Sequence, residues 1–312
     1  MLLRILPLFA VIALGAVAGA VRLFPSPVTA IGALNRFALY VAFPALVVAG
    51  LAADSLVLPQ SAGFYLVHVV ALLAQVVCAV ALVAKVPALR RERGPVAMAA
   101  MFGNVAYLGI PFCVAVLGTA ATGLAAMSAG IHILLSMTVG PVLLLAGGGG
   151  NVWGNLRAVL PRIVVQPLVW SPFLGLSLWL LGDGSRRFVT SLLSPVGNAA
   201  GPVALFMIGL YLYVNRGQFL EAGGAVLGIC VLKLACFPSL TWLVVLLVGW
   251  AVPLAELECQ LVVLMAGMPV AVTTFALAEE FRTGRKVIST AVVATTTMAL
   301  LTLPLLASWI AS

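Results

Sequence analysis

Long apolar stretches that carry almost no charge constrain this chain more than any other feature. Crossing a bilayer takes roughly 20 mostly apolar residues per helix, because backbone N–H and C=O groups must pair within the helix in hydrocarbon. Ten such stretches follow one another along the 312 residues. They cover residues 3–22, 28–50, 62–85, 95–118, 121–146, 163–181, 188–214, 220–249, 255–280 and 287–310. The sequence therefore predicts an all-α polytopic membrane protein with ten transmembrane helices.

The distribution of charge predicts how these helices are oriented. Charged residues make up only 8% of the chain, against about 25% in a typical soluble domain. If the N-terminus is outside, eleven basic residues fall in cytoplasmic connections and three, Arg4, Arg186 and Arg187, fall outside. Positive charge concentrates on the cytoplasmic side of membrane proteins. We therefore expect a multi-pass protein of the cell (inner) membrane with both termini outside, and interpret the net charge of +8 as a topology signal rather than a nucleic-acid-binding surface.

Residue matches at one fixed offset indicate an internal repeat, and each match joins a predicted helix to the one five places later. Several residue pairs share an offset of 158 positions: Pro44 with Pro202, Pro95 with Pro253, Gly109 with Gly267, Pro111 with Pro269 and Gln75 with Lys233. Five is an odd number of crossings, so the second repeat would enter the membrane from the opposite side. Inverted repeats are typical of secondary transporters, whose site lies near the midplane between the repeats. The predicted organisation is one five-helix repeat over residues 1–150 and a second, inverted one over 151–312.

Pro111 and Pro269 lie in the middle of the fourth and ninth predicted helices, each two residues after a glycine, Gly109 or Gly267. Proline removes a backbone donor and glycine permits unusual dihedrals. We expect both helices to be broken at these points and to cross, with half-helix ends that favour an anion. The alternative is a pair of simple proline kinks.

Polar side chains beside the two expected breaks are candidates for binding a substrate. Asn104 follows a glycine in the fourth helix, and Thr273 and Thr274 follow Pro269 in the ninth. Such groups can hydrogen-bond a carboxylate without carrying a charge themselves. The alternative role is hydrogen bonding between helices, which contributes about 0.6 kcal/mol on average in membrane bundles.

Lys233 is the most informative single residue, because it lies deep inside the eighth predicted helix. A cation at mid-membrane costs on the order of 3 kcal/mol, so it normally faces protein or water and has a function. Lys233 and its neutral repeat partner Gln75 therefore join the candidate site, with a purely structural lysine as the alternative. His68 and His132 are isolated in sequence and are expected to be hydrogen-bonded bundle residues rather than proton carriers.

Enzymatic, metal and cofactor chemistry finds no support in the sequence. The chain has no H-E-x-x-H, no G-x-S-x-G and no phosphate-binding loop. Its five cysteines form no C-x-x-C pair, and no acidic residue falls in the middle of a predicted span. We expect no enzyme activity, no metal site, no disulfide and no cofactor.

Six phrases in order along the chain resemble the auxin efflux carrier family, in its short prokaryotic form related to the PIN-type plant exporters. They are LNRFALYVAFPALV, GNVAYLGIPF, LLSPVGNAAGPVALFMIGLYL, KLACFPSLTWL, AGMPVAVTTFALAEEF and STAVVATTTMALLTLPLL. The resemblance implies a scaffold of helices one, two, six and seven, with a homodimer formed through it as a further expectation. It also implies a transport unit of helices three to five and eight to ten, which shifts like an elevator to move organic anions.

The substrate is the least constrained feature. Many family members place asparagine and tyrosine shortly after the proline of the ninth helix, where this chain has Thr273 and Phe275. We expect a secondary carrier of small carboxylates. A cation/proton antiporter is one alternative, which the lack of mid-span acids disfavours. A membrane sensor that transports nothing is another, but it would leave the broken helices and Lys233 without a purpose.

Overall fold

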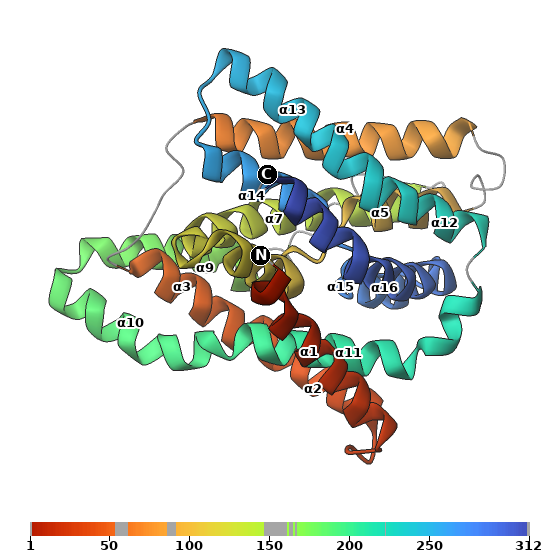
Figure 1. The fold of residues 1–312 in the computed structure, drawn as a ribbon, viewed down its shortest axis with the longest axis horizontal. Helices are drawn as coiled ribbons and strands as arrows, with labels where there is room; N and C mark the ends of the chain where they lie inside the picture. The colour runs from red at the N-terminus through yellow and green to blue at the C-terminus, as the bar shows by residue number, and fades with distance from the viewer. Residues whose placement is uncertain are drawn as a thin grey trace. The chain divides into compact units, whose positions relative to one another are not determined.

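The computed structural model of the protein describes residues 2–53, 62–85, 92–146, 161, 165, 167–221 and 223–310. Over these residues the chain is helical, and the only β-pairing is an isolated bridge between Gly103 and Val270. Figure 1 labels the α-helices in chain order. They are α1 (Leu2–Ala20), α2 (Pro27–Phe37), α3 (Phe43–Ala52), α4 (Ala62–Lys85), α5 (Arg93–Met101), α6 (Ile110–Leu117), α7 (Thr122–Ala146), α9 (Pro167–Ser177), α10 (Asp183–Asn198), α11 (Ala200–Val214), α12 (Gly224–Val231), α13 (Phe237–Ala251), α14 (Glu256–Ala266), α15 (Thr273–Glu280) and α16 (Arg285–Ile310).

Seven helical stretches within the described residues are long and apolar enough to cross a membrane. They are Leu3–Ala20, Pro27–Ala52, Ala62–Lys85, Thr119–Leu144, Asp183–Val214, Gly224–Ala251 and Arg285–Ile310. The prediction of an all-helical polytopic membrane protein is therefore confirmed. The count of ten and the inverted repeats stay predictions, and the boundary between residues 150 and 151 lies outside the described residues.

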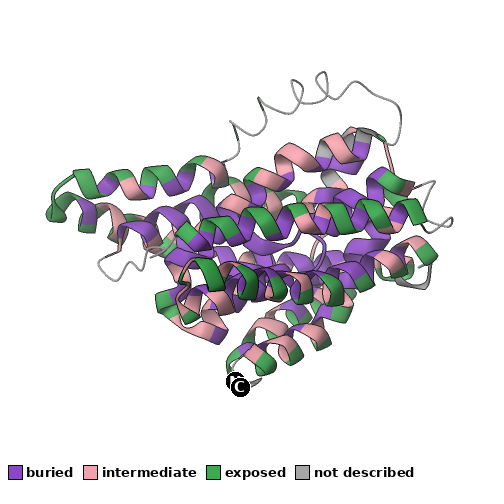
Figure 2. Cartoon of the chain, turned by 90° about the horizontal axis from the view of Figure 1, so that it is seen from above, coloured by how far each residue is buried: buried purple, intermediate pink, exposed green. Residues whose placement is uncertain are grey.

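Large apolar side chains cover much of the helical surface, as a lipid-facing protein requires. Trp250 is 94% exposed and Leu180 is 87% exposed. Figure 2 shows exposed positions recurring along the helices beside buried ones. In water, a contiguous apolar surface of this kind would associate, whereas lipid tails solvate it.

The chain divides into two compact units. The first comprises Met1–Leu58, Ala106–Gly130 and Val164–Arg216. Within it α1 packs against α11, and α3 packs against α9 and α10. The α1–α11 contact is close because a Cβ on Gly15 would collide with the carbonyl oxygen of Phe206, and one on Gly209 with that of Ile12. Small residues at such positions let membrane helices approach each other's backbones.

The second unit comprises Pro59–Val105, Ile131–Ile163 and Gly217–Ser312. Here α4 packs against α5, α13 and α14, and α12 packs against α16. Figure 1 shows α4 and α13 lying side by side. This unit contains the two interrupted helical segments, α5 and the pair α14–α15, around which the candidate site is built.

Three π-helical turns explain how several mid-span prolines are accommodated. They are η1 (Ala38–Ala42), η3 (Val105–Gly109) and η7 (Leu232–Cys236), and each ends two residues before a proline, Pro44, Pro111 or Pro238. A proline ring clashes with the carbonyl four residues earlier, and in all three cases that carbonyl belongs to the π-turn. The wider turn relieves the clash and the helix continues.

The break predicted at Gly109–Pro111 is therefore wrong. The π-turn η3 leads directly into α6, and Gly109 has α-helical dihedrals. The interruption in this part of the chain lies earlier, at residues 102–104, between the end of α5 and the start of η3.

Candidate functional site

Two interrupted helices of the second unit are joined by backbone hydrogen bonds. Asn104 N–H donates to Pro269 O at 2.7 Å, and Ala271 N–H donates to Phe102 O at 2.9 Å. These bonds flank the bridge between Gly103 and Val270. We call the paired segments, residues 102–104 and 267–272, the crossing. It supplies partners for backbone groups that would otherwise be unpaired inside a membrane.

The local sequence explains why both chains leave the helix here. Pro269 cannot donate a backbone hydrogen bond, and α14 ends at Ala266, with Gly267 as its cap. On α16, the Thr295 hydroxyl accepts a 3.1 Å hydrogen bond from Val270 N–H, which holds the unwound segment. The break predicted at Gly267–Pro269 is present, whereas its counterpart lies at 102–104.

Lys233 reaches the crossing from the π-turn η7. Its side chain is fully buried, and its ammonium donates a 3.4 Å hydrogen bond to Ala266 O. The Nζ atom lies 5.5 Å from the ring centroid of Phe237 and 3.1 Å from the point where a Cβ on Gly103 would stand. No carboxylate pairs with it in the described part of the chain. A buried cation with only one weak carbonyl partner is costly.

Asn104 adds a side-chain donor that has no acceptor among the described residues. The residue is 3% exposed and its backbone is engaged by Pro269, yet its side-chain Nδ2 has no hydrogen-bond partner among the described residues. Buried polar groups are almost always satisfied, so an orphaned amide donor calls for an explanation. An acceptor supplied by a bound anion would provide one.

The two threonines predicted to bind substrate begin α15, directly after the crossing. Thr274 is fully buried, and its hydroxyl donates to Ala271 O at 2.6 Å, so it closes the first turn of the helix. Thr273 is half-buried. Thr295, which the sequence did not single out, also bonds the crossing, through Val270 N–H. Nothing in its local pattern distinguishes it from its threonine neighbours on α16.

Gln75 is not part of the crossing but lies next to it. Its Nε2 donates to the Thr241 hydroxyl at 3.1 Å, while its Oε1 is buried without a partner. Gln75 lines a small cavity with about 20 Å³ of room for the centre of a water molecule. His68, His132, Thr241 and Ala266 also line it. Since Ala266 O accepts from Lys233, this cavity adjoins the lysine.

Gly109 and Pro111 belong to the first unit, whereas the crossing belongs to the second. Gly109 precedes the first residue of α6, and Pro111 packs on Gly201 within the first unit, with its Cβ 3.3 Å from where a Cβ on that glycine would stand. Of the residues predicted for the site, the second unit therefore gathers Lys233, Asn104 and Pro269 at the crossing. Thr273, Thr274 and Gln75 lie next to it.

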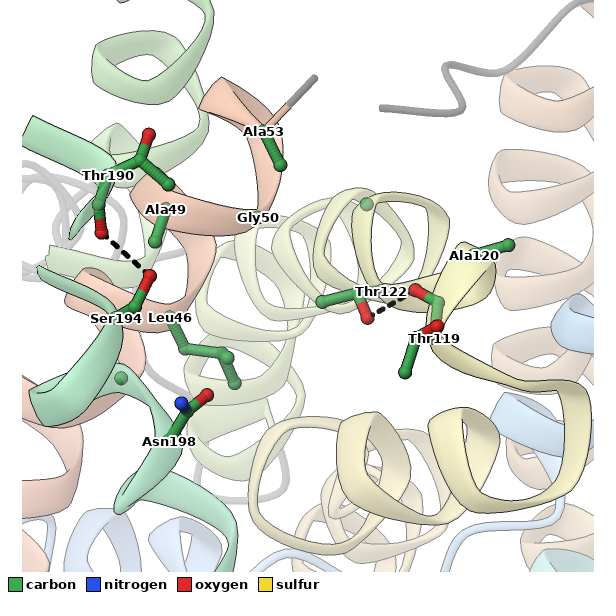
Figure 3. A pocket seen from close by; sticks show the side chains of 12 residues that line it. Leu46, Ala49, Gly50, Ala53, Thr119, Ala120, Thr122, Thr190, Ser194 and Asn198 are labelled. Atoms are coloured by element: carbon green, nitrogen blue, oxygen red, sulfur yellow. Dashed lines mark hydrogen bonds between the residues drawn. The ribbon is translucent and has the colours of Figure 1, made fainter. Parts of the chain in front are cut away.

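A separate cavity of about 210 Å³ lies within the first unit, between α3, the start of α7 and α10. Figure 3 shows Thr119 and Thr122 on one wall, with Thr190, Ser194 and Asn198 of α10 on another. The Thr122 and Ser194 hydroxyls donate to the backbone carbonyls of Thr119 and Thr190, both at 2.7 Å. The cavity has a neutral lining of hydroxyl and amide groups, and none of the residues predicted for the site belongs to it.

Comparison with known proteins identifies the family. A family model described as "Membrane transport protein" matches residues 1–153 and 151–307. The chain belongs to this family. The resemblance to auxin efflux carriers is thereby confirmed, and the protein is a membrane transporter rather than an enzyme.

One curated relative of this membrane transport protein matches over almost its whole length. It is a protein of Rhizobium meliloti (strain 1021) named "Putative malonate transporter", 28% identical over 307 residues. The alignment covers 96% of this chain and 92% of the relative.

Proposed function

We propose that this membrane transport protein is a secondary carrier of small organic anions, chiefly carboxylates. The observation that carries the proposal is the fully buried Lys233 ammonium, which has no carboxylate partner in the described residues. A permanent cation in this position costs on the order of 3 kcal/mol. A carboxylate bound at the crossing would offset that cost and accept from the unpartnered Asn104 amide.

The name of the relative narrows the chemical class of the substrate that we propose. Malonate is a small dicarboxylate, and the crossing offers two donor groups, Lys233 Nζ and Asn104 Nδ2, without an opposing acid among the described residues. Neutral groups alone would bind a carboxylate weakly, whereas hydrogen bonds to charged groups contribute about 1.5–3 kcal/mol each. A dianion of this size is therefore the substrate that we propose for the site.

The proposal includes the architecture expected from the sequence. Repeats 1–150 and 151–312 would be inverted relative to each other, with both termini outside the cell membrane. The transport unit would carry the anion across in an elevator-like shift while the scaffold helices stay fixed, in a homodimer joined through those helices. The placement of the crossing and Lys233 within one compact unit supports this reading, because an elevator carries its site inside the moving part.

Substrate exchange in proteoliposomes tests the function. Vesicles loaded with unlabelled malonate should accumulate labelled malonate through the purified protein, and other small carboxylates should compete while neutral amides of the same size should not. The proposal fails if no mono- or dicarboxylate exchanges. It also fails if the protein instead moves sodium or potassium against protons.

A further inference from the structure

His132 of α7 contacts the backbone of the crossing. Its Nε2 lies 3.3 Å from Gly103 N and 3.2 Å from Met101 O. The residue is buried, with 7% of its surface exposed. A histidine that seemed isolated in the sequence therefore touches the same unwound segment that Lys233 approaches.

The two contacts of Nε2 suit two different states of the ring. A backbone N–H can only donate and a carbonyl can only accept. When Nε2 lacks a proton it can accept from Gly103 N–H, and when it carries one it can donate to Met101 O. Residues Met101 and Gly103 thus provide a hydrogen-bond partner for Nε2 of His132 whether or not that atom carries a proton.

Lys233 and His132 stand beside each other at the crossing. The point where a Cβ on Gly103 would stand is 3.1 Å from Lys233 Nζ and 3.5 Å from His132 Nε2. Two positive charges so close in a poorly solvated region repel each other. Protonating Lys233 and His132 at the same time therefore costs free energy. A carboxylate between them removes that penalty. Anion binding and protonation of the second base are then thermodynamically linked.

A small cavity adjoins this pair. His132, His68 and Gln75 all line it, and it is large enough for one water molecule. The unpartnered Gln75 Oε1 would accept from that water. His68 Nδ1 lies 2.8 Å from Phe64 O and, since a carbonyl can only accept, Nδ1 carries the proton of that hydrogen bond.

We propose that His132 takes up the proton that accompanies a carboxylate to Lys233, delivered through the water-sized cavity that His68 and Gln75 line. The proton leaves an oxygen of the cavity water, an N–H bond forms on the imidazole, and the water is restored by a proton arriving from solvent. Release of the anion reverses the steps. The inference rests on the proposed carboxylate transport and adds its coupling ion.

Among the described residues, two titratable side chains face the His132 imidazole. Lys233 approaches from η7, and His68 lines the same small cavity from α4. Gln75, Thr241 and the backbone of α5 and α14 supply only neutral groups. No acidic side chain lines the cavity or contacts the ring within the part of the chain described, so nothing on the protein substitutes for the anion.

The test counts protons taken up with each malonate. Calorimetry of malonate binding in buffers of different ionisation enthalpy measures this number on the purified protein. We expect the wild type to take up about one proton per anion. His132→Gln keeps a side chain that can donate and accept but cannot carry the proton, so proton uptake should fall towards zero. Thr138→Val removes an exposed hydroxyl from the same helix and should leave it unchanged.

The outcomes separate this inference from the proposed function. Malonate exchange without proton uptake by the wild type would overturn the role of His132 but leave the carrier standing. Unchanged proton uptake in His132→Gln would do the same. Absence of malonate binding, together with absence of exchange of any mono- or dicarboxylate by the wild type, would instead overturn the proposed function. If His132→Gln does not fold, His132→Asn and the wild-type stoichiometry still decide.

Discussion

Lys233 owes its position to a local widening of its helix. It stands in the π-turn η7, four residues before Phe237, whose ring lies 5.5 Å from the ammonium. Its partners among the described residues are the ring face of Phe237 and the Ala266 carbonyl, and both are weak compared with a carboxylate. The residue is thus held ready for an anion that the described protein does not supply.

Replacing Lys233 by glutamine, the residue at its repeat position, should strongly weaken malonate exchange. We expect the variant to fold, because glutamine removes a buried charge, but to lose roughly 10–100-fold in affinity, the value of a charge-assisted hydrogen bond of about 1.5–3 kcal/mol. Lys233→Arg should rescue only partly, since the planar guanidinium does not replace a compact ammonium. Exchange rates in proteoliposomes measure this, with the exposed Lys85→Gln as control. Normal exchange by Lys233→Gln would make the lysine structural.

Asn104→Ala should raise the KM for malonate by roughly tenfold or more, because one hydrogen bond to a charged group is lost. The backbone bond from residue 104 to Pro269 survives the substitution, so the crossing and the melting temperature should be preserved. Asn215→Ala is the matched control, since its amide contacts Tyr211 O at the end of α11. An unchanged KM in Asn104→Ala would place the anion elsewhere.

At this scale the sequence predicts some residues and misses others for a physical reason. A functional lysine within an apolar run can be predicted, because the free-energy cost of placing its charge in the membrane is a property of the residue itself. The role proposed for His132 cannot be predicted from the sequence, because it depends on a contact between α7 and a segment about 30 residues earlier. Thr295 is missed for the same reason.

At the level of elements, proline chemistry explains both a correct expectation and an error. Near Pro269, the chain unwinds after Gly267 and pairs with the other segment. At Pro111, the clash with the preceding turn is relieved by widening that turn. The same two residue types, two positions apart, therefore give a break in one place and a π-turn in the other. Sequence spacing alone cannot distinguish them, because the outcome depends on which neighbour offers a hydrogen bond.

Pro238→Ala should impair transport although Pro238 itself lies outside the crossing. Without the ring, residue 238 can donate to Leu234 O, and η7 can rewind into an α-helix. Each residue gained or lost rotates a helix by about 100°, which would turn Lys233 away from Ala266. We expect reduced malonate exchange with an unchanged or higher melting temperature. Pro304→Ala is the control, because α16 continues through Pro304 as an α-helix. Full activity of Pro238→Ala would show that the π-turn is dispensable.

For the whole molecule, the helical membrane character follows directly from composition and apolar run length. Helix α4 occupies the same residues, 62–85, that its apolar run predicts. The helices expected at 95–118 and 255–280 exist as shorter pieces, since each is interrupted at the crossing. Whether the repeats are inverted depends on relations between distant segments that run length does not encode.

Orientation in the membrane is testable with single cysteines. In a background without the exposed Cys78 and Cys236, Arg285→Cys should react with an impermeant maleimide only in inside-out vesicles. Gly182→Cys, on the opposite side in the expected topology, should react in intact cells. Arg91, a second basic position on the expected inner side, lies outside the described residues. Labelling of Arg285→Cys from outside intact cells would reverse the topology.

The backbone pairing at the crossing also has a consequence for biogenesis. Phe102 and Asn104 find their partners only at Ala271 and Pro269, about 170 residues further along the chain. At a synthesis rate of about 5–20 residues per second, roughly 10–30 s pass before those partners leave the ribosome. Until then, lipid cannot form hydrogen bonds with the Asn104 N–H and Phe102 C=O groups. The newly made first half must therefore remain beside the insertion machinery, or keep water around residues 102–104, until the second half arrives.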